Sequence, residues 1–396
     1  MISKQSEPWR WHEELNNELY GIRKHLHQYP ELSFQEENTQ KYICACLERW
    51  GIPYQKMSDT GIVVDIWGEK GDGKHIALRA DIDALPIEER SDVSFPSKNK
   101  GVMHACGHDG HTTILLGAIN HLWKYKSKLS GLVRCIFQPG EEAEGAAKKM
   151  IADGVLKNPN IESVIALHLW PKLPFGSIGL KTEAVTAACD DFVIEIAGEG
   201  GHAARPHQSI DAIAIGVEVV HALKFITTKW CDPVDPAIIH VGRFDGGKAN
   251  NIVADKVVIE GTIRTISSDV RKKMKDKFIE LVSGITKQFG GDVKVDFFNG
   301  HPAVINDVGI TKQVKESAEE IVGVTSVYDL EKPSMGADDF GYFSELIPST
   351  YFRLGIKEEG KEIYDLHHPK FYFNKEIIPI GSKVLTNYAV NCLKTT

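Results

Sequence analysis

"KHIALRADIDALP", residues 74–86, decides the fold class of this chain. Its first half is an apolar stretch of strand length, and its second half is a short acidic loop that contains Asp81 and Asp83. After this stretch, the residue pattern predicts helices and strands in alternation: a helix at 111–126, a strand at 131–137, a helix at 146–153 and a strand at 162–171. Strands that alternate with helices predict an α/β domain built around a mostly parallel sheet.

The pattern changes near residue 186. The order becomes strand, helix, two strands, helix and strand, at 191–200, 209–228, 237–244, 256–265, 268–290 and 293–298. This is the order of a ferredoxin-like α+β motif, and Ser209 is predicted to cap its first helix. Because 396 residues exceed what one core usually supports, we expect a discontinuous first domain, 1–185 and 300–396, with a second domain inserted at 186–299.

The composition argues against several classes of partner. The formal net charge of −8 gives little support for a nucleic-acid partner. We find no apolar run near the roughly 18 residues of a membrane-spanning helix, and the polar N-terminal stretch does not resemble a signal peptide. The seven cysteines lack the spacing of a disulfide framework, which is typical of a reducing compartment. We therefore expect a cytoplasmic protein without nucleic-acid or membrane partners.

Polar side chains gather where the predicted strands of the first domain end. Three groups follow three strands: Asp81 with Asp83, Glu141 with Glu142 and Glu144, and His168. In open α/β sheets, ligands bind outside the carboxyl ends of the strands. The fold is therefore expected to bring these three groups together, although they are far apart in the sequence.

The stretch "VMHACGHDGHTTILLGA", residues 102–118, adds a thiol and an imidazole. Cys106 and His108 are good ligands for zinc-like metals, and the glycines between and after them allow a tight loop. Taken alone, a buried cysteine is more often just a small apolar side chain. The carboxylates and His168, which should lie nearby, favour a metal site instead.

The pair Glu141 and Glu142 has two interpretations. Adjacent glutamates usually form a solvated acidic loop. A metal hydrolase, however, needs one carboxylate on the metal and a second one free as a general base beside the attacking water. His168 also has a second interpretation, as a histidine whose hydrogen bonds are satisfied within the core.

Further candidates lie downstream. His367 and His368 precede a proline, and His202 lies in a glycine-rich loop of the inserted domain. Arg264 lies on a predicted strand, where its guanidinium could bind a carboxylate or form a surface salt bridge. Asp338 fits a structural role in its loop better than a ligand role.

Together these residues resemble the M20 family of metallopeptidases and amidohydrolases, in particular its aminoacylases, hippurate hydrolases and auxin-conjugate amidohydrolases. The matching segments span nearly the whole chain in the family's order: "IRKHLHQYPELSFQEENT", "ALRADIDALP", "MHACGHDGHTTILLGA", "FQPGEEAEGAA", "ALHLWP", "GEGGHAARPHQSIDA", "EGTIRT", "SMGADDFGYF" and "LHHPKFYF". The resemblance implies a phosphorylase/hydrolase-like di-metal catalytic domain with an inserted ferredoxin-like domain. That domain would act as a lid and mediate a homodimer or a tetramer.

The resemblance also implies a role for individual residues. The ligands of a two-metal centre would be Cys106, His108, Glu142, His168 and His367. Asp81 and Asp83 would support them, at a position where many family peptidases carry H-x-D. The histidine ligand of that motif is missing here, and Cys106 is expected to replace it.

The remaining roles concern the chemistry and the substrate. Glu141 would be the general base, and His202 would stabilise the oxyanion in the active site of a neighbouring subunit. Arg264, with Asn250 or Asn251, would bind the carboxylate of the substrate.

The function that follows is metal-dependent hydrolysis of N-acyl-L-amino acids, such as N-acetyl or N-benzoyl derivatives, to a carboxylic acid and a free amino acid. The alternatives are a dipeptidase or carboxypeptidase of the same family, and a specialised deacetylase such as an N-acetyldiaminopimelate deacetylase. A non-catalytic metal-binding protein would not require Glu141 as a non-ligand carboxylate. The two divalent ions could be manganese, zinc, cobalt or nickel.

Overall fold

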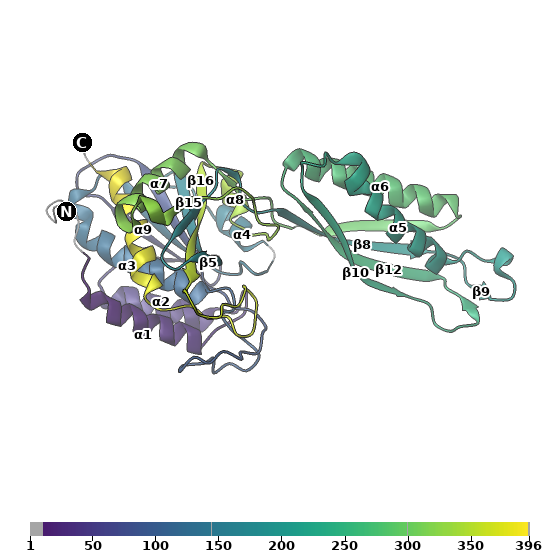
Figure 1. Cartoon of the computed structure of the whole chain (residues 1–396), viewed down its shortest axis with the longest axis horizontal. Helices are drawn as coiled ribbons and strands as arrows, with labels where there is room; N and C mark the ends of the chain where they lie inside the picture. The colour runs from purple at the N-terminus through teal and green to yellow at the C-terminus, as the bar shows by residue number, and fades with distance from the viewer. Residues whose placement is uncertain (1–10, 144, 299, 395–396) are drawn as a thin grey trace. The chain divides into compact units, whose positions relative to one another are not determined.

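The computed structural model describes residues 11–143, 145–298 and 300–394, so Glu144 lies outside the described residues. The chain divides into two compact units, which are drawn in Figure 1. The first unit comprises Met1–Glu183, Ile305–Lys332 and Tyr342–Thr396, and the second comprises Ala184–Val304 and Pro333–Gly341. The junctions between the units lie after Glu183 and after Val304, whereas they were predicted after residues 185 and 299. The first junction is thus two residues earlier than predicted and the second is five residues later.

The segment 333–341 falls within the range that was predicted for the first domain. Residues 333–341 belong to the second unit and not to the first. Two backbone hydrogen bonds hold the segment there, from Ser334 N to Val185 O (2.8 Å) and from Ala187 N to Gly336 O (2.9 Å). Since these bonds join residues about 150 positions apart, sequence pattern alone could not reveal them.

The first unit is built on a large sheet, and the predicted α/β class is confirmed. Among the described residues the sheet has eight strands in the order β1-β2-β4-β3-β5-β16-β6-β15. Their bounds are β1 Gln55–Met57, β2 Gly61–Trp67, β3 His75–Asp81, β4 Leu132–Gln138, β5 Ser163–Pro174, β6 Ile178–Leu180, β15 Val327–Asp329 and β16 Ser349–Lys357. The centre, from β4 through β3 and β5 to β16, is parallel, whereas β1, β2 and β6 pair antiparallel with neighbours, so the sheet is mixed.

The helices of this unit are α1 Glu14–Gln28, α2 Glu37–Arg49, α3 His108–Tyr125, α4 Ala146–Ala152, α7 Val308–Val322 and α9 Ile377–Leu393. The short helix α8, Gly341–Ser344, lies at the boundary between the units, and two short 3-10 turns cover Lys126–Lys128 and Val324–Ser326. Helix α3 contacts α1, α9 and the sheet strand β3, which explains why its residues 108–122 are all buried. It begins three residues earlier than predicted, because Gly107 adopts a left-handed conformation (φ 87°) and directs the chain into the helix at His108.

The second unit has the order β8 Ala188–Ala197, α5 Ala212–Trp230, β10 Ala237–Gly246, β12 Lys256–Thr265, α6 Ser268–Gln288 and β13 Asp292–Phe298. These four strands form an antiparallel sheet in the order β10-β12-β8-β13, and α5 and α6 cover one face of it (Figure 1). The short strands β9 Gly201–His202 and β11 Ile252–Val253 pair beyond the end of β8. A 3-10 turn covers Pro206–Gln208. Of the other short strands, β7 Glu183–Ala184 spans the junction and β14 Ile305–Asn306 belongs to the first unit.

The cap of α5 differs from the prediction. Asp211, and not Ser209, caps the helix, because its Oδ1 accepts hydrogen bonds from Ile213 N (2.9 Å) and Ala214 N (3.2 Å). Ser209 instead donates to Pro206 O within the preceding turn. Within the described part of the chain, no helix combines the length and the apolar character needed to cross a membrane.

Candidate metal centre

The loop before α3 places Cys106 and His108 at the edge of the sheet. Gly107 lies so close to its surroundings that a Cβ atom there would come within 3.0 Å of Leu169 Cδ1. A Cβ atom on Gly110 would come within 2.6 Å of the Phe373 ring. Both glycines are therefore required for the close packing of this loop, and Gly107 also for its positive φ.

Two buried histidines present one nitrogen each to the same space. His108 Nδ1 donates to Asp83 Oδ1 at 3.1 Å, and His168 Nδ1 donates to Leu169 O at 2.7 Å. In the neutral form of each ring, Nε2 is therefore the nitrogen that carries the lone pair. Metal-binding histidines have this arrangement, with the second ring nitrogen donating to a carboxylate or a backbone carbonyl.

The donor atoms form two groups that share Cys106. In one group the ligand atoms of Cys106, His108 and His168 all lie within 4.8 Å of one another, and in the other those of Cys106, Glu142 and His367 do so. Cys106 Sγ is 3.3 Å from His168 Nε2, and His367 Nε2 is 3.3 Å from Glu142 Oε1. The structure thus brings the five predicted ligands together, from four segments of the sequence.

His367, and not His368, faces this cluster. The His367 backbone has a positive φ of 64°, and its N–H donates to Ala105 O at 2.9 Å, which ties its loop to the Cys106 loop. His368 stacks on Tyr364 with 4.6 Å between the ring centres, and its Nδ1 accepts from Lys370 N. The side chain of His367 is 51% exposed, so this side of the cluster is open.

Asp81 and Asp83 lie beneath the ligands and are completely buried. Asp81 binds Arg79 Nη1 and His111 Nδ1, both at 2.6 Å. Asp83 accepts from Ser33 Oγ (2.7 Å) and from the backbone N–H of Glu142 (2.9 Å), besides its bond with His108. The two carboxylates therefore fix the orientation of the surrounding groups. Arg79 is a site residue that the motifs did not indicate, although a charged residue within an apolar strand is itself a signal of a buried ion pair.

His111 is close to the cluster but both of its nitrogens are occupied. Its Nδ1 donates to Asp81, and its Nε2 accepts from Leu169 N at 2.9 Å. It thus has no lone pair left for a metal and orients the loop and the strand instead.

His168 is not at the end of its strand, as predicted, but in the middle of it. Strand β5 continues to Pro174 because it pairs with β16 from Val164 to Trp170 and again at Pro174. Its pairing with β3 ends earlier, at Ala166. His168 therefore lies just beyond the last β3 partner, at the edge where β3 ends in Asp81.

The electrostatics of the cluster favour a cation. Burial alone disfavours a charged imidazole, but the charges of Asp81 and Asp83 outweigh it and raise the pKa of His108 to about 10. Burial, together with the charges of Glu142 and Glu141, raises the pKa of the Cys106 thiol well above its ordinary value. His108 Nε2 is buried and has no hydrogen-bond partner among the described residues. Soft and borderline donors beside buried carboxylates are the chemistry that divalent transition metals require, so the residues fit such ions.

Glu141 lies beside the ligands without belonging to either group that contains Cys106. Its Oε2 is 3.9 Å from His108 Nε2, and the ligand atoms of Glu141, Glu142 and His108 lie within 4.8 Å of one another. Its side chain is 9% exposed. A carboxylate in this position can exchange protons with a molecule bound at the cluster.

The remaining predicted residues lie in the second unit. His202 is exposed on β9, and Ala203 N donates to Asn251 O, so His202 lies next to Asn250 and Asn251. Arg264 lies near the C-terminal end of β12, and its Nη1 donates to Met335 O at 2.9 Å.

Within a single chain, Arg264 does not lie next to these two asparagines. Asn250 and Asn251 precede β11, which leads into β12 at Lys256. The eight-residue step along β12 from Lys256 to Arg264 spans about 25 Å at 3.3 Å per residue. An extended strand thus separates Arg264 from the two asparagines within one chain, and their shared role in binding the substrate stays a prediction.

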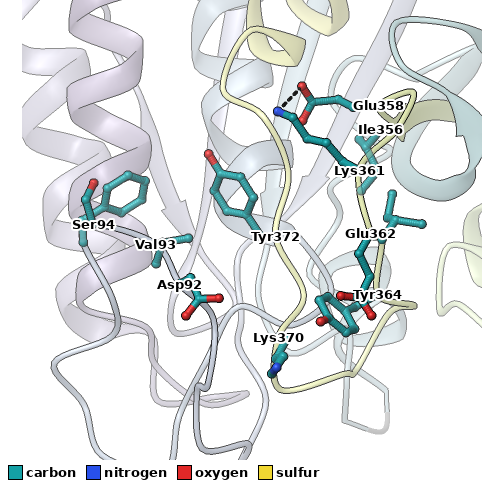
Figure 2. A pocket seen from close by; sticks show the side chains of 12 residues that line it. Asp92, Val93, Ser94, Ile356, Glu358, Lys361, Glu362, Tyr364, Lys370 and Tyr372 are labelled. Atoms are coloured by element: carbon teal, nitrogen blue, oxygen red, sulfur yellow. Dashed lines mark hydrogen bonds and ion pairs between the residues drawn. The ribbon is translucent and has the colours of Figure 1, made fainter.

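A separate pocket of about 470 Å³ lies beside the loop that carries His367 (Figure 2). Residues from two stretches, 92–95 and 356–372, line it, and Lys361 pairs with Glu358 on its wall. The five candidate ligands are not among its lining residues.

Comparisons with known proteins identify the family of the chain. The family model described as peptidase family M20/M25/M40 matches residues 77–391. N-acetyl-L-cysteine deacetylase of Bacillus subtilis (strain 168) is 42% identical over 380 residues, which cover 96% of this chain and 89% of that protein. Thermostable carboxypeptidase 1 of Saccharolobus solfataricus is 38% identical, with 93% and 94% covered. A crystal structure of a dinuclear metal-binding M20 peptidase from Bacillus subtilis matches with a TM-score of 0.82 at 32% identity, covering 96% and 99%. The chain belongs to peptidase family M20/M25/M40 and is an amide-cleaving hydrolase.

Proposed function

We propose that the chain hydrolyses the amide bond of N-acyl-L-amino acids at a centre of two divalent metal ions. The observation that carries this proposal is the pair of donor groups that share Cys106, with Glu141 beside them. The names of relatives support the substrate class, since one is a deacetylase of N-acetyl-L-cysteine. The two products would be a carboxylic acid and a free amino acid.

The two donor groups indicate how the metals would be held. One ion would be bound by His108 and His168, the other by Glu142 and His367, and Cys106 would contact both. When bound, the ions would polarise the amide carbonyl and lower the pKa of a water molecule. The mixture of thiolate, imidazole and carboxylate donors admits zinc, manganese, cobalt or nickel.

Glu141 is proposed as the group that moves the proton. Its carboxylate lies beside the ligands and can accept a proton from the attacking water. The same group can then donate that proton to the leaving nitrogen, which must be protonated to depart as an amine. Asp83 supports both steps, because it fixes the backbone of Glu142 and the ring of His108.

His202 is proposed to stabilise the oxyanion at the active site of a second subunit. Its Nδ1 accepts a hydrogen bond from Ala204 N at 3.1 Å, so the proton of the neutral ring is on Nε2. An exposed N–H of this kind is a suitable donor to a developing negative charge. We propose in addition that Arg264 binds the carboxylate of the substrate, and that Asn250 or Asn251, which lie next to His202, reach the same group from the second subunit.

A homodimer is proposed to form through the second unit. Strand β10 is at the edge of its sheet, and Ile238 and Phe244 on this strand are 42% and 40% exposed. The adjacent helix α5 exposes Val217 and Phe225, at 53% and 54%, on one face. An unpaired strand edge beside an exposed apolar helix face is suited to pair with a second copy of itself.

We expect the double substitution Val217→Glu and Phe225→Glu to convert a dimer into a monomer, because it would bury four like charges in a two-fold interface. Light scattering after size-exclusion chromatography measures the change in mass. Ile279→Glu, at an exposed apolar residue of α6, is the matched control and should leave the dimer intact. A wild-type protein of monomer mass at micromolar concentration would contradict the proposal.

The substrate class can be tested with a matched pair of amides. N-acetyl-L-alanine and glycyl-L-alanine differ only in the ammonium group next to the scissile carbonyl. We expect kcat/KM for the acetyl compound to be roughly tenfold higher or more, because an unpaired charged group in the site is costly. The metal-loaded protein should also be assayed with N-benzoyl and indole-acetyl amino acids.

The same panel tests the second candidate function. A carboxypeptidase is favoured by the likeness to thermostable carboxypeptidase 1. It would prefer a blocked dipeptide such as benzyloxycarbonyl-glycyl-L-alanine over N-acetyl-L-alanine. Preference for the free dipeptide over both would refute the proposed function and favour a dipeptidase.

A further inference from the structure

Arg23 is a buried cation of α1 that binds two segments of the metal centre at once. Its Nε donates to Asp109 Oδ2 at 3.2 Å, and its Nη1 donates to Phe373 O at 3.1 Å. The residue is only 1% exposed. The proposed function assigns it no role.

One contact is next to a candidate ligand in the sequence, and the other is six residues from one. Asp109 follows His108 in the first turn of α3, so a shift of its side chain moves the backbone that carries this ligand. Phe373 lies on the chain that leaves His367, and its ring contacts the loop glycine Gly110. Arg23 therefore connects a ligand of one donor group to a ligand of the other.

His27, one helical turn after Arg23, completes the arrangement. Its Nδ1 is 2.9 Å from Asp109 Oδ2, and its Nε2 is 3.1 Å from Glu89 Oε1. Because carboxylates only accept hydrogen bonds, both ring nitrogens must carry protons, and His27 is an imidazolium. The two buried cations of α1 are thus balanced by the carboxylates of Asp109 and Glu89. Glu89 is held in turn by the N–H of Ser97 at 2.5 Å.

Aromatic rings exclude water from the Arg23 side chain. Its guanidinium lies 3.7 Å from the centre of the Phe373 ring, 5.4 Å from that of Tyr372 and 5.5 Å from that of Phe95. Tyr372 and Phe95 also line the pocket of about 470 Å³ described above, whereas Arg23 is not among its lining residues. In such a dry environment the two directed hydrogen bonds of a guanidinium fix geometry more strictly than a mobile ammonium would.

From these contacts we infer that Arg23 is a positioning residue, which sets the spacing between the two metal subsites through Asp109 and Phe373. This inference rests on the proposed metal centre. It does not require Arg23 to touch a metal or a substrate. Loss of Arg23 would leave the carboxylate of Asp109 short of a partner and would release the chain after His367.

The test compares Co²⁺ binding by three metal-free proteins: the wild type, Arg23→Met and Arg23→Lys. Equilibrium dialysis measures the affinity, and the absorption spectrum of the thiolate-bound ion reports its coordination. We expect Arg23→Met to weaken Co²⁺ affinity roughly 10- to 100-fold and to alter the spectrum, as is typical for residues that orient metal ligands. Arg23→Lys should give a smaller loss, because lysine keeps the charge but cannot reach both acceptors with a fixed fork.

Arg134→Met is the matched control. Arg134 is also a buried arginine, with two hydrogen bonds to the carboxylate of Asp65 (2.8 and 2.7 Å), but it touches no candidate ligand. The substitution Arg134→Met should lower the Tm to about the same degree as Arg23→Met, but it should leave the Co²⁺ affinity and the absorption spectrum unchanged. Equal Co²⁺ affinity in Arg23→Met and wild type, or an equal loss in Arg134→Met, would overturn the inference.

Two outcomes separate the inference from the proposed function. If the wild-type protein itself binds no Co²⁺, the proposed metal centre is wrong. If the wild type binds Co²⁺ and both Arg23 variants bind it equally well, only the positioning role is wrong. Should Arg23→Met not fold, Arg23→Lys decides alone, and wild-type affinity in this variant would refute the role.

Discussion

Glu141→Gln is expected to lower kcat for N-acetyl-L-alanine by roughly 10²- to 10⁴-fold, while the protein still binds its metals. The amide has the shape of the carboxylate but cannot accept the proton of the attacking water. Glu141 belongs to neither donor group that contains Cys106, so its replacement removes no proposed ligand. Steady-state kinetics with metal analysis of the same samples measures both quantities.

Glu142→Gln is the paired control for this prediction. Glu142 lies in the donor group of Cys106 and His367, so its amide variant should lose metal affinity as well as activity. If Glu142→Gln kept its metals and Glu141→Gln lost them, the two roles would have to be exchanged. Near-normal turnover by metal-loaded Glu141→Gln would show that another group moves the proton.

Much of the first unit could be predicted because its signals are local. The apolar strand at 131–137 and the helical periodicity after His111 lie within single stretches, and the structure has these elements within a few residues. The convergence of Asp81, Glu141 and His168 followed from a general property of parallel sheets, whose carboxyl ends meet at one edge.

The choice among neighbouring histidines required information that the residue pattern lacks. His367 and His368 are chemically equal in the sequence, and only the resemblance to the family favoured His367. The structure separates them by a positive φ at His367 and by a hydrogen bond to Ala105, which no periodicity encodes.

Long-range contacts account for what the prediction missed. Arg23 lies in the quoted segment "IRKHLHQYPEL", yet its hydrogen-bond partners are 86 and 350 residues away. The segment 333–341 joins the second unit through bonds to residues near 185 for the same reason. Such contacts depend on how whole elements pack, so a local reading of the chain cannot supply them.

Removal of the metals is the second change with a large expected effect. A metal ion typically supplies several kcal/mol of transition-state stabilisation, so metal-free protein should lose activity by on the order of 10³-fold. Cys106→Ala should do the same even with excess metal, because Cys106 belongs to both donor groups. His367→Ala removes a ligand from one group only and should retain a single ion.

The central claim, that these five side chains form a two-metal centre for amide hydrolysis, is tested most directly by titration of the metal-free wild-type protein. Zn²⁺ or Mn²⁺ is added in known amounts, and bound metal and hydrolysis of N-acetyl-L-alanine are measured on the same samples. The account predicts that activity rises with bound metal and reaches a plateau at about two ions per chain. Full activity in protein shown to contain no metal, or binding of two ions without any gain in hydrolysis, would contradict it.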